Sequence, residues 1–329
     1  MSEFFDVRRD DRLAAEARLA PAATCSEAAV RAVPEPPDEY RTPYERDRDR
    51  ILHSKAFRRL KHKTQVFIHP DGDHFVTRLT HTLQVTQIGR AMAVALGLNE
   101  PLTEAICLGH DTGHSPFGHT GEDALTPYVE GEWHHASQSV RIFRVLEPCN
   151  LTEQVLDGIR AHSWKIDPPP ETPEGYLCRF ADRIAYLSHD VEDAVRAGVI
   201  TVGQLPGREI FGEPGSGWIA TMIRAVIDGT HRAGRVAMDD EILAVMNEIR
   251  DFMFERVYLR PEAEDQRRKA ITVIRSLVDH YLEQPDEIPA SYRHEEADRT
   301  TQVIDYVAGM TDRYALREYD RVFRPDGIT

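Results

Sequence analysis

The sequence predicts an all-α protein. Most of its 329 residues fall into long segments whose apolar side chains recur at helical spacing, whereas the alternating pattern of strands is sparse. Glycine and asparagine stand at the ends of several segments, where they end or begin helices. No internal repeat interrupts the pattern, and the length suits one large domain or two modest ones.

The first third of the chain is expected to hold three helices after an irregular lead-in. Residues 1–40 are rich in Ala and Arg and end in prolines, so we predict a poorly ordered segment with at most a short helix over 12–19. Gly97 suits the end of one helix and Asn99 the start of the next. The predicted elements are helices over 45–67, 77–96 and 101–108 and a turn over 69–73.

Beyond this third, helices are predicted around one loop of unusual composition. Gly113, Gly118 and Gly121 punctuate residues 110–122, so the backbone must turn tightly there and present its histidines on a shaped loop. Further loops are expected over 168–173 and 203–217. The helices predicted from apolar spacing cover 135–146, 152–162, 175–197, 218–231, 239–257, 262–283 and 295–311.

The composition excludes several classes of protein. Lys plus Arg total 40 against 55 Asp plus Glu, a net charge of −15, which argues against a globally basic nucleic-acid binder. No apolar run approaches the roughly 18 residues of a membrane span, and charged residues interrupt the first segment where a secretory signal is apolar. The cysteines lack CxxC spacing, which favours reduced thiols in a cytoplasmic protein: Cys25, Cys107, Cys149 and Cys178.

Positive charge is nevertheless concentrated in one segment. Residues 41–63 hold nine basic and three acidic side chains, which leaves a local charge of +6. The first half alternates acids with bases, as in helices laced with ion pairs. The second half has no acid in reach, so we expect Arg58 and Arg59 to contact a phosphate or nucleotide.

Histidine carries the chemical signal. A single histidine is more often an ordinary core or surface residue, but His81 lies on an otherwise apolar helical stripe, where its ring nitrogens need partners. The adjacent His110 and Asp111 end a predicted helix and can both turn toward one point. A His-Asp pair alone is a weak signal, because the chain holds a second one at residues 189–190.

A metal ion is one partner that would explain these positions. Asp182, Tyr186 and Asp190 form a polar stripe beside the apolar face of their helix, as the wall of a site would. Two histidines and two aspartates, without cysteine, disfavour a structural zinc site. Such a set suits Mn²⁺, Fe²⁺, Mg²⁺, Ni²⁺ or Zn²⁺ with positions open to water and substrate.

Four motifs, in order, resemble HD-domain phosphohydrolases and in detail the bacterial deoxyguanosinetriphosphate triphosphohydrolase-like family, which shares its core with the dNTPases of higher organisms. They cover residues 46–67, 77–85, 109–122 and 181–194. The resemblance implies an all-α architecture with an HD core and an additional C-terminal helical region. We therefore expect a lead-in over 1–40, the core over 41–200, and a region over 201–329 that packs on the core and offers a surface to neighbouring subunits.

The resemblance also implies a role for each residue of the site. The metal ligands would be His81, His110, Asp111 and Asp182. The catalytic centre would be lined by His114, His119, Glu122 and His135, with His134 as an open alternative to His135. Arg78 and Arg183 would contact phosphates, Tyr186 and Asp190 the deoxyribose, and Gln65 the sugar or base.

The implied reaction is metal-dependent hydrolysis of a deoxynucleoside triphosphate such as dGTP to deoxynucleoside and tripolyphosphate. One divalent ion per site is expected, Mn²⁺ or Mg²⁺ first. His119, supported by Glu122, is our first choice for the group that acts at the scissile bond. The family also implies a homo-oligomer such as a hexamer and an allosteric dNTP; a nucleic-acid partner is not favoured. The alternatives are an HD phosphohydrolase of a monophosphate, cyclic or alarmone nucleotide, and a non-catalytic metal-containing regulatory or nucleic-acid-binding scaffold.

Overall fold

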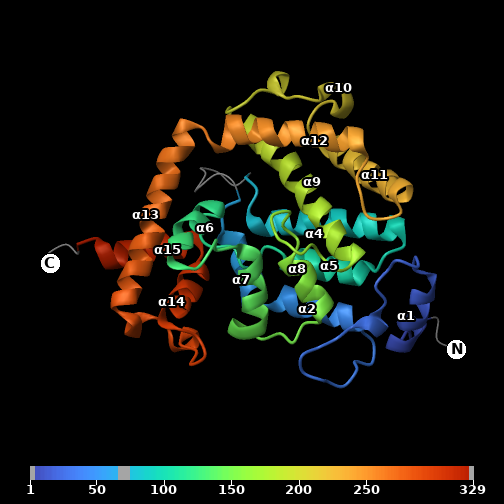
Figure 1. Ribbon diagram of the computed structural model, residues 1–329, viewed down its shortest axis with the longest axis horizontal. Helices are drawn as coiled ribbons and strands as arrows, with labels where there is room; N and C mark the ends of the chain where they lie inside the picture. The colour runs from blue at the N-terminus through green and yellow to red at the C-terminus, as the bar shows by residue number, and fades with distance from the viewer. Residues whose placement is uncertain (1–3, 66–74, 326–329) are drawn as a thin grey trace.

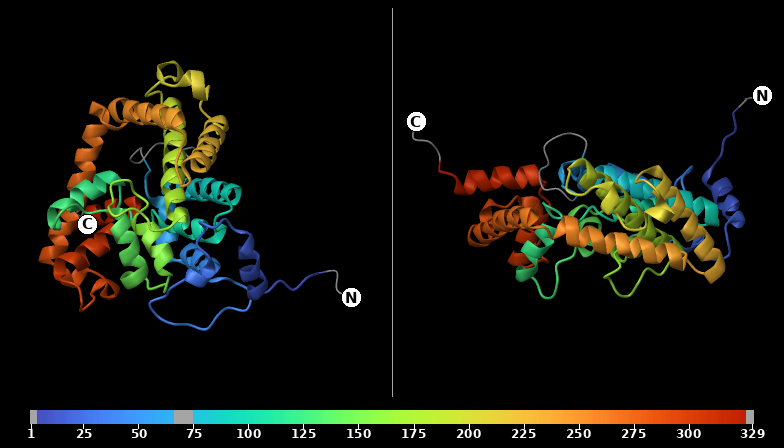
Figure 2. Two further views of the ribbon diagram at one scale, coloured as in Figure 1. Left: turned by 45° about the vertical axis from the view of Figure 1, so that its right-hand side comes forward. Right: turned by 90° about the horizontal axis from the view of Figure 1, so that it is seen from above.

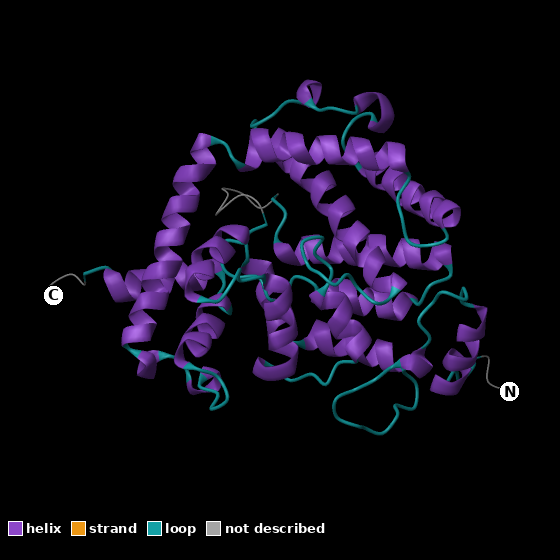
Figure 3. Ribbon diagram, viewed as in Figure 1, coloured by secondary structure: helices purple, strands orange, loops and turns teal. Residues whose placement is uncertain are grey.

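The computed structural model describes residues 4–65 and 75–325, and helices joined by loops make up this part of the chain (Figures 1 and 3). It contains fifteen α-helices and no β-strand; the only β features described are two isolated bridges. The predicted all-α class is therefore confirmed. The turn predicted over 69–73 lies outside the described residues.

Three helices form the centre of the fold: α4 (Arg78–Leu96), α5 (Glu100–Gly109) and α9 (Pro173–Arg196), each packed on the other two. The apolar stripe of α4 is fully buried at Val85 and Ile88. Burial of this stripe carries His81 into the interior with only 1% of its surface exposed. Helices α2 (Pro43–His53) and α8 (Glu153–Arg160) cover the outer side of α5.

Local sequence signals set several helix ends as predicted. The Thr77 side chain accepts a hydrogen bond from the amide of Thr80 at the start of α4, and Gly97 ends this helix in the left-handed region at φ 66°. Asn99 accepts from the amide of Leu102 and so begins α5. These caps fix the directions from which α4 and α5 approach each other.

Three predicted elements differ from the structure, and one of them is the loop expected over 203–217, which contains α10 (Arg208–Phe211). The helix expected over 45–67 breaks at Ser54, which has an extended backbone and caps a new helix, α3 (Lys55–Arg59), by accepting from the amide of Phe57. The glycine-rich segment over 110–122 is not a loop to its end, because α6 (His119–Leu125) begins inside it. Glycine density hid this start, and His119 therefore projects from a helix rather than from a loop.

The remaining helices complete the core and build a second one. The lead-in is described from residue 4 onward, and its Thr24 amide and hydroxyl donate to Glu174 at the start of α9. The last helix, α15, was not among the predicted elements. The other bounds are α1 (Arg9–Ala15), α7 (His135–Arg141), α10 (Arg208–Phe211), α11 (Ser216–Ala233), α12 (Asp240–Met253), α13 (Pro261–Glu283), α14 (Arg299–Ala308) and α15 (Asp312–Phe323).

The C-terminal helices hold the glycine-rich segment in place. Helices α13–α15 gather at one end of the molecule beside α6 (Figure 2), and Phe117 joins their hydrophobic cluster. The backbone of Phe117 has a positive φ of 61°, which is strained for a bulky residue. Asp312 accepts hydrogen bonds from the amides of Phe117 (3.0 Å) and Thr64 (2.8 Å), and Lys63 donates to the carbonyls of Ala308 and His114. The C-terminal region thus fixes the segment that carries His114 and His119.

We predict that Asp312→Ala destabilises the protein, because it leaves the buried amide of Phe117 and the partly buried amide of Thr64 without an acceptor. Such a loss costs about 1–3 kcal/mol of unfolding free energy. Urea denaturation measures it, with Asp320→Ala, an exposed aspartate on the same helix, as the control. Equal midpoints for the two variants would contradict the anchoring role.

Candidate metal and catalytic site

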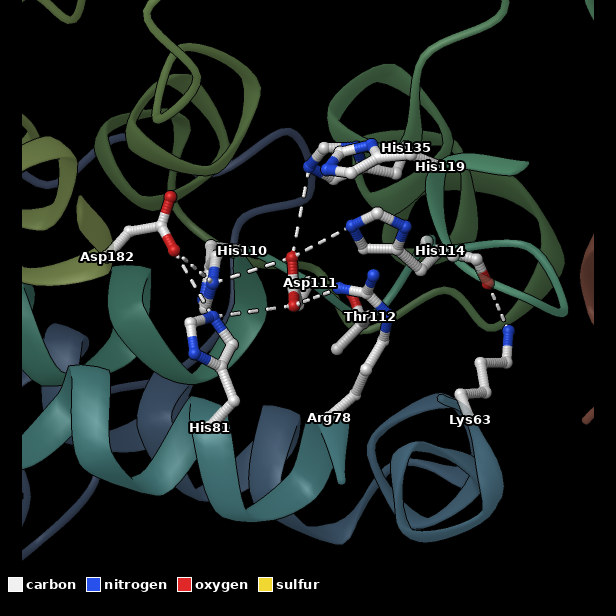
Figure 4. Close-up of polar contacts among 12 residues, drawn as sticks. Lys63, Arg78, His81, His110, Asp111, Thr112, His114, His119, His135 and Asp182 are labelled. Atoms are coloured by element: carbon white, nitrogen blue, oxygen red, sulfur yellow. Dashed lines mark hydrogen bonds and ion pairs between the residues drawn. The ribbon is translucent and has the colours of Figure 1, made fainter. Parts of the chain in front are cut away.

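Four predicted metal ligands converge at the centre of the fold (Figure 4). His81 comes from α4, His110 and Asp111 from the end of α5, and Asp182 from α9. The Nε2 atom of His81 lies 3.1 Å from Asp182 Oδ1 and 3.7 Å from Asp111 Oδ2. The Nε2 atom of His110 lies 3.5 Å from Asp111 Oδ1 and 3.8 Å from Asp182 Oδ1. All four side chains therefore point into one small volume.

The hydrogen bonding of His110 indicates that these four side chains suit a divalent cation. Its Nδ1–H donates to the carbonyl of Cys107 at 2.6 Å, which leaves a lone pair on Nε2. That Nε2 atom is buried and has no hydrogen-bond partner among the described residues. A buried lone pair facing two carboxylates is the environment that a divalent metal ion satisfies. Burial opposes the charge of Asp182, but the hydrogen bond from His81 lowers its pKa to about 2, so this carboxylate is ionised.

A chain of contacts that the sequence did not reveal supports His81 at Nδ1, the ring nitrogen that does not face the carboxylates. The Nδ1 atom of His81 lies 2.8 Å from Nε2 of His189, whose Nδ1 lies 2.8 Å from Asp190 Oδ1, although not in line for a hydrogen bond. The other oxygen of Asp190 accepts from the Tyr258 hydroxyl at 2.6 Å. Such outer contacts fix the orientation and tautomer of a metal-binding histidine. The second His-Asp pair thus supports the site, and Asp190, expected at the deoxyribose, lies between His189 and the Tyr258 hydroxyl in this structure.

Asp111 forms the buried ion pair of the site. Its Oδ2 accepts from Nη1 of Arg78 at 2.7 Å, and Arg78 is only 2% exposed. Burial alone would raise the pKa of Asp111, but His110, His114 and Arg78 together hold it well below its ordinary value. Arg78, expected at a phosphate, is therefore directed to Asp111 in this structure.

A second cluster adjoins the first through Asp111 and contains the predicted catalytic residues. The Nε2 atom of His114 lies 3.2 Å from Asp111 Oδ1, and its ring stacks on that of His135 with centroids 3.8 Å apart. Glu122 Oε1 lies 2.5 Å from Nδ1 of His135 and 3.3 Å from Nδ1 of His114. Burial would raise the pKa of Glu122, but His135 and His119 hold it well below its ordinary value.

His119 differs from its neighbours because it reaches solvent. Its side chain is 74% exposed, while its Nδ1 atom lies 3.3 Å from Glu122 Oε2. The surrounding protein favours the neutral ring, but the charge and hydrogen bond of Glu122 outweigh this effect and raise the pKa of His119. His114, fully enclosed and near Arg78, has its pKa lowered well below the ordinary value by burial. The cluster therefore holds a histidine with a raised pKa at its rim and one with a lowered pKa inside.

The structure distinguishes His135 from its neighbour. His135 is buried against Glu122, whereas His134 accepts a hydrogen bond through its Nδ1 from the amide of Ala136 and so caps α7. Burial lowers the pKa of His134 to about 4. His162, which the sequence did not single out, lies 3.0 Å from His135 between their Nε2 atoms. Its position at the end of α8 gave no periodic signal.

The residues expected to contact substrate are more dispersed. Arg183 extends over the ring of Trp164 at 5.6 Å, and its buried Nε has no partner among the described residues. Tyr186 lies on the same helix, where burial raises its pKa to about 12. The others are engaged or lie beside the glycine-rich segment: Arg58 donates to the carbonyls of His53 and Ser54, Arg59 to the Tyr292 hydroxyl, and the Gln65 backbone passes Gly118.

Comparison with known proteins agrees with this arrangement. The HD domain model matches residues 78–187, and the model of a phosphohydrolase-associated domain matches residues 236–321. A deoxyguanosinetriphosphate triphosphohydrolase-like protein of Caldanaerobacter subterraneus is 46% identical over 92% of this chain and 91% of its own. Proteins of the same description from Clostridium perfringens and Geobacter sulfurreducens are 44% and 39% identical, each over 88% of this chain and 90% and 91% of theirs.

The chain belongs to the deoxyguanosinetriphosphate triphosphohydrolase-like family. It is accordingly an HD-superfamily phosphohydrolase whose buried His and Asp groups suit a divalent metal site. None of the described helices has the length and apolar character needed to cross a membrane. Among solved structures, a hypothetical protein from Aquifex aeolicus matches at a TM-score of 0.49 and 19% identity, over 84% of this chain and 71% of that one.

We predict that His189→Ala weakens metal binding about 10–100-fold, because His81 loses the partner that orients it. Tyr258→Phe, one step further along the chain of contacts, is expected to have a smaller effect. Isothermal titration of the metal-free protein with Mn²⁺ measures both. An unchanged affinity in His189→Ala would show that the contact with His81 has no supporting role.

Proposed function

We propose that this protein is a metal-dependent dNTP triphosphohydrolase that converts a substrate such as dGTP to deoxynucleoside and tripolyphosphate. One observation carries the proposal: a metal-suited set and a histidine cluster share Asp111. His114 Nε2 lies 3.2 Å from the same oxygen that His110 faces at 3.5 Å. Groups that bind a phosphate and groups that move protons are therefore adjacent, as hydrolysis at phosphorus requires.

The chemistry of the leaving group is the reason for proposing His119 as the general acid. Attack of water at the α-phosphorus expels the 5′-oxygen of the nucleoside, an alkoxide much more basic than pyrophosphate. The raised pKa of His119 keeps its ring protonated to a higher pH than an ordinary histidine, so it can supply the required proton. The exposed position of His119 leaves it accessible to a large substrate.

The same groups must also stabilise a polyanion. A divalent ion held by His81, His110, Asp111 and Asp182 would supply Lewis-acid polarisation of a phosphoryl oxygen and lower the pKa of a bound water. Arg183, with a buried Nε that has no partner in the described chain, offers a cation beside Asp182 on α9. Mn²⁺ or Mg²⁺ is the ion we propose for activity.

We predict that assays with each dNTP, singly and in mixtures with Mn²⁺ or Mg²⁺, yield tripolyphosphate and deoxynucleoside. Mixtures are included because we also propose a homo-oligomer that a second dNTP can activate. Asp111→Ala is expected to lose both metal and turnover, whereas His119→Ala keeps the metal and loses turnover. Orthophosphate released from a deoxynucleoside monophosphate would instead support another HD hydrolase, and a fully active Asp111→Ala protein would reject the site.

We predict that Glu122→Gln moves the alkaline limb of kcat to lower pH. The carboxylate raises the pKa of His119, and the acid acts only while protonated, so its removal causes activity to fall at a lower pH. A pH profile of kcat measures the shift. Asp123→Asn, which removes an exposed acid from the same helix, is the matched control. An alkaline limb at the same pH in Glu122→Gln and wild type would show that Glu122 does not raise the pKa of the catalytic acid.

A further inference from the structure

The hydrogen bonds around His135 and His162 leave two facing nitrogen atoms without a proton between them. The Nδ1 atom of His162 lies 2.7 Å from the carbonyl of Ile159, an acceptor, so it must carry a proton. The Nδ1 atom of His135 lies 2.5 Å from the carboxylate of Glu122 and must also carry one. In neutral rings both Nε2 atoms then hold lone pairs, and these atoms face each other at 3.0 Å.

Two lone pairs at this distance repel, so a positive species must lie between or beside them. The surroundings favour a cation larger than a proton. Asp111, His135 and His162 are at least 96% buried, and one donor atom of each lies within 4.8 Å of the others. Asp111 Oδ1 is 3.8 Å from His135 Nε2, while its Oδ2 faces His81 on the opposite side at 3.7 Å.

We propose that Asp111, His135 and His162 form a second divalent metal site, which shares the carboxylate of Asp111 with the first. Ligand atoms 3.0 Å apart fit two adjacent positions around an ion with bonds of about 2.1 Å. Two imidazoles and a carboxylate suit a first-row transition metal such as Mn²⁺. This second site depends on the proposed function only because it shares Asp111 with the first metal site.

A second ion would give the phosphate-binding region a further positive charge. Its open positions would take oxygens of the substrate's phosphate chain, and the shared carboxylate would keep the two ions close. Pairs of ions about 3.5–4 Å apart recur in enzymes that act on phosphate esters. His162 would then be a metal ligand rather than a core histidine, although it lies just after α8, a helix that none of the predicted site residues occupies.

The test is the Mn²⁺ content of the full-length chain after removal of metal by a chelator, reloading and desalting, together with its EPR spectrum. We expect two Mn²⁺ per chain with the exchange-coupled spectrum of a carboxylate-bridged pair. His162→Gln should bind one Mn²⁺ without coupling. His53→Gln, an exposed histidine on α2, should behave like the wild type.

Each other result overturns the second site. One Mn²⁺ in both wild type and His162→Gln would show that a proton, and not a metal ion, lies between the two rings. That result would still be consistent with the first metal site. Two uncoupled ions that persist in His162→Gln would locate the second ion elsewhere. No bound Mn²⁺ would reject the proposed function as well. Because the wild-type stoichiometry and coupling are decisive alone, the test stands even where His162→Gln fails to fold.

Discussion

The carboxylate of Asp111 organises the interior of this protein. A charge buried this deeply is costly unless it is paired, and Asp111 is paired with Arg78 at 2.7 Å. The other contacts of its two oxygens are with four histidines. These come from α4, the end of α5, the glycine-rich segment before α6, and α7: His81, His110, His114 and His135. Helices from distant parts of the chain thus converge on one negative charge, and the site follows from how that charge is compensated.

The C-terminal region contributes to this arrangement without supplying the charge. Tyr258 reaches Asp190 behind His81, and Asp312 holds the strained backbone of Phe117 between His114 and His119. A catalytic centre built on the core helices therefore depends on contacts made by the region that follows them. This dependence gives a physical reason for the phosphohydrolase-associated domain to accompany the HD domain in one chain.

Sequence reasoning succeeded where local signals decide the outcome. The apolar stripe of α4 predicted an inward His81, and Gly97 and Asn99 marked helix ends that the structure confirms. It failed at Ser54, because a serine amid good helix formers gives no warning that it will cap a second helix. It also missed α6, since its first turn follows a glycine-rich run.

The supporting residues of the site were harder to predict for a different reason. His162, His189 and Tyr258 act through partners that are distant in sequence, so spacing along the chain does not reveal these partners. Only the packing of α9 against α4, of α12 against α9 and of α8 beside α7 brings these side chains to the ligands. One signal was available: His189 stands seven residues after Asp182, two helical turns along the same face of α9.

The most direct measurement of the central claim is anomalous diffraction from crystals grown with Mn²⁺, with data collected on both sides of the manganese absorption edge. The account predicts an anomalous peak bonded to His81, His110, Asp111 and Asp182. A peak that avoids these four side chains, or no peak among them in a protein that retains Mn²⁺, would contradict it.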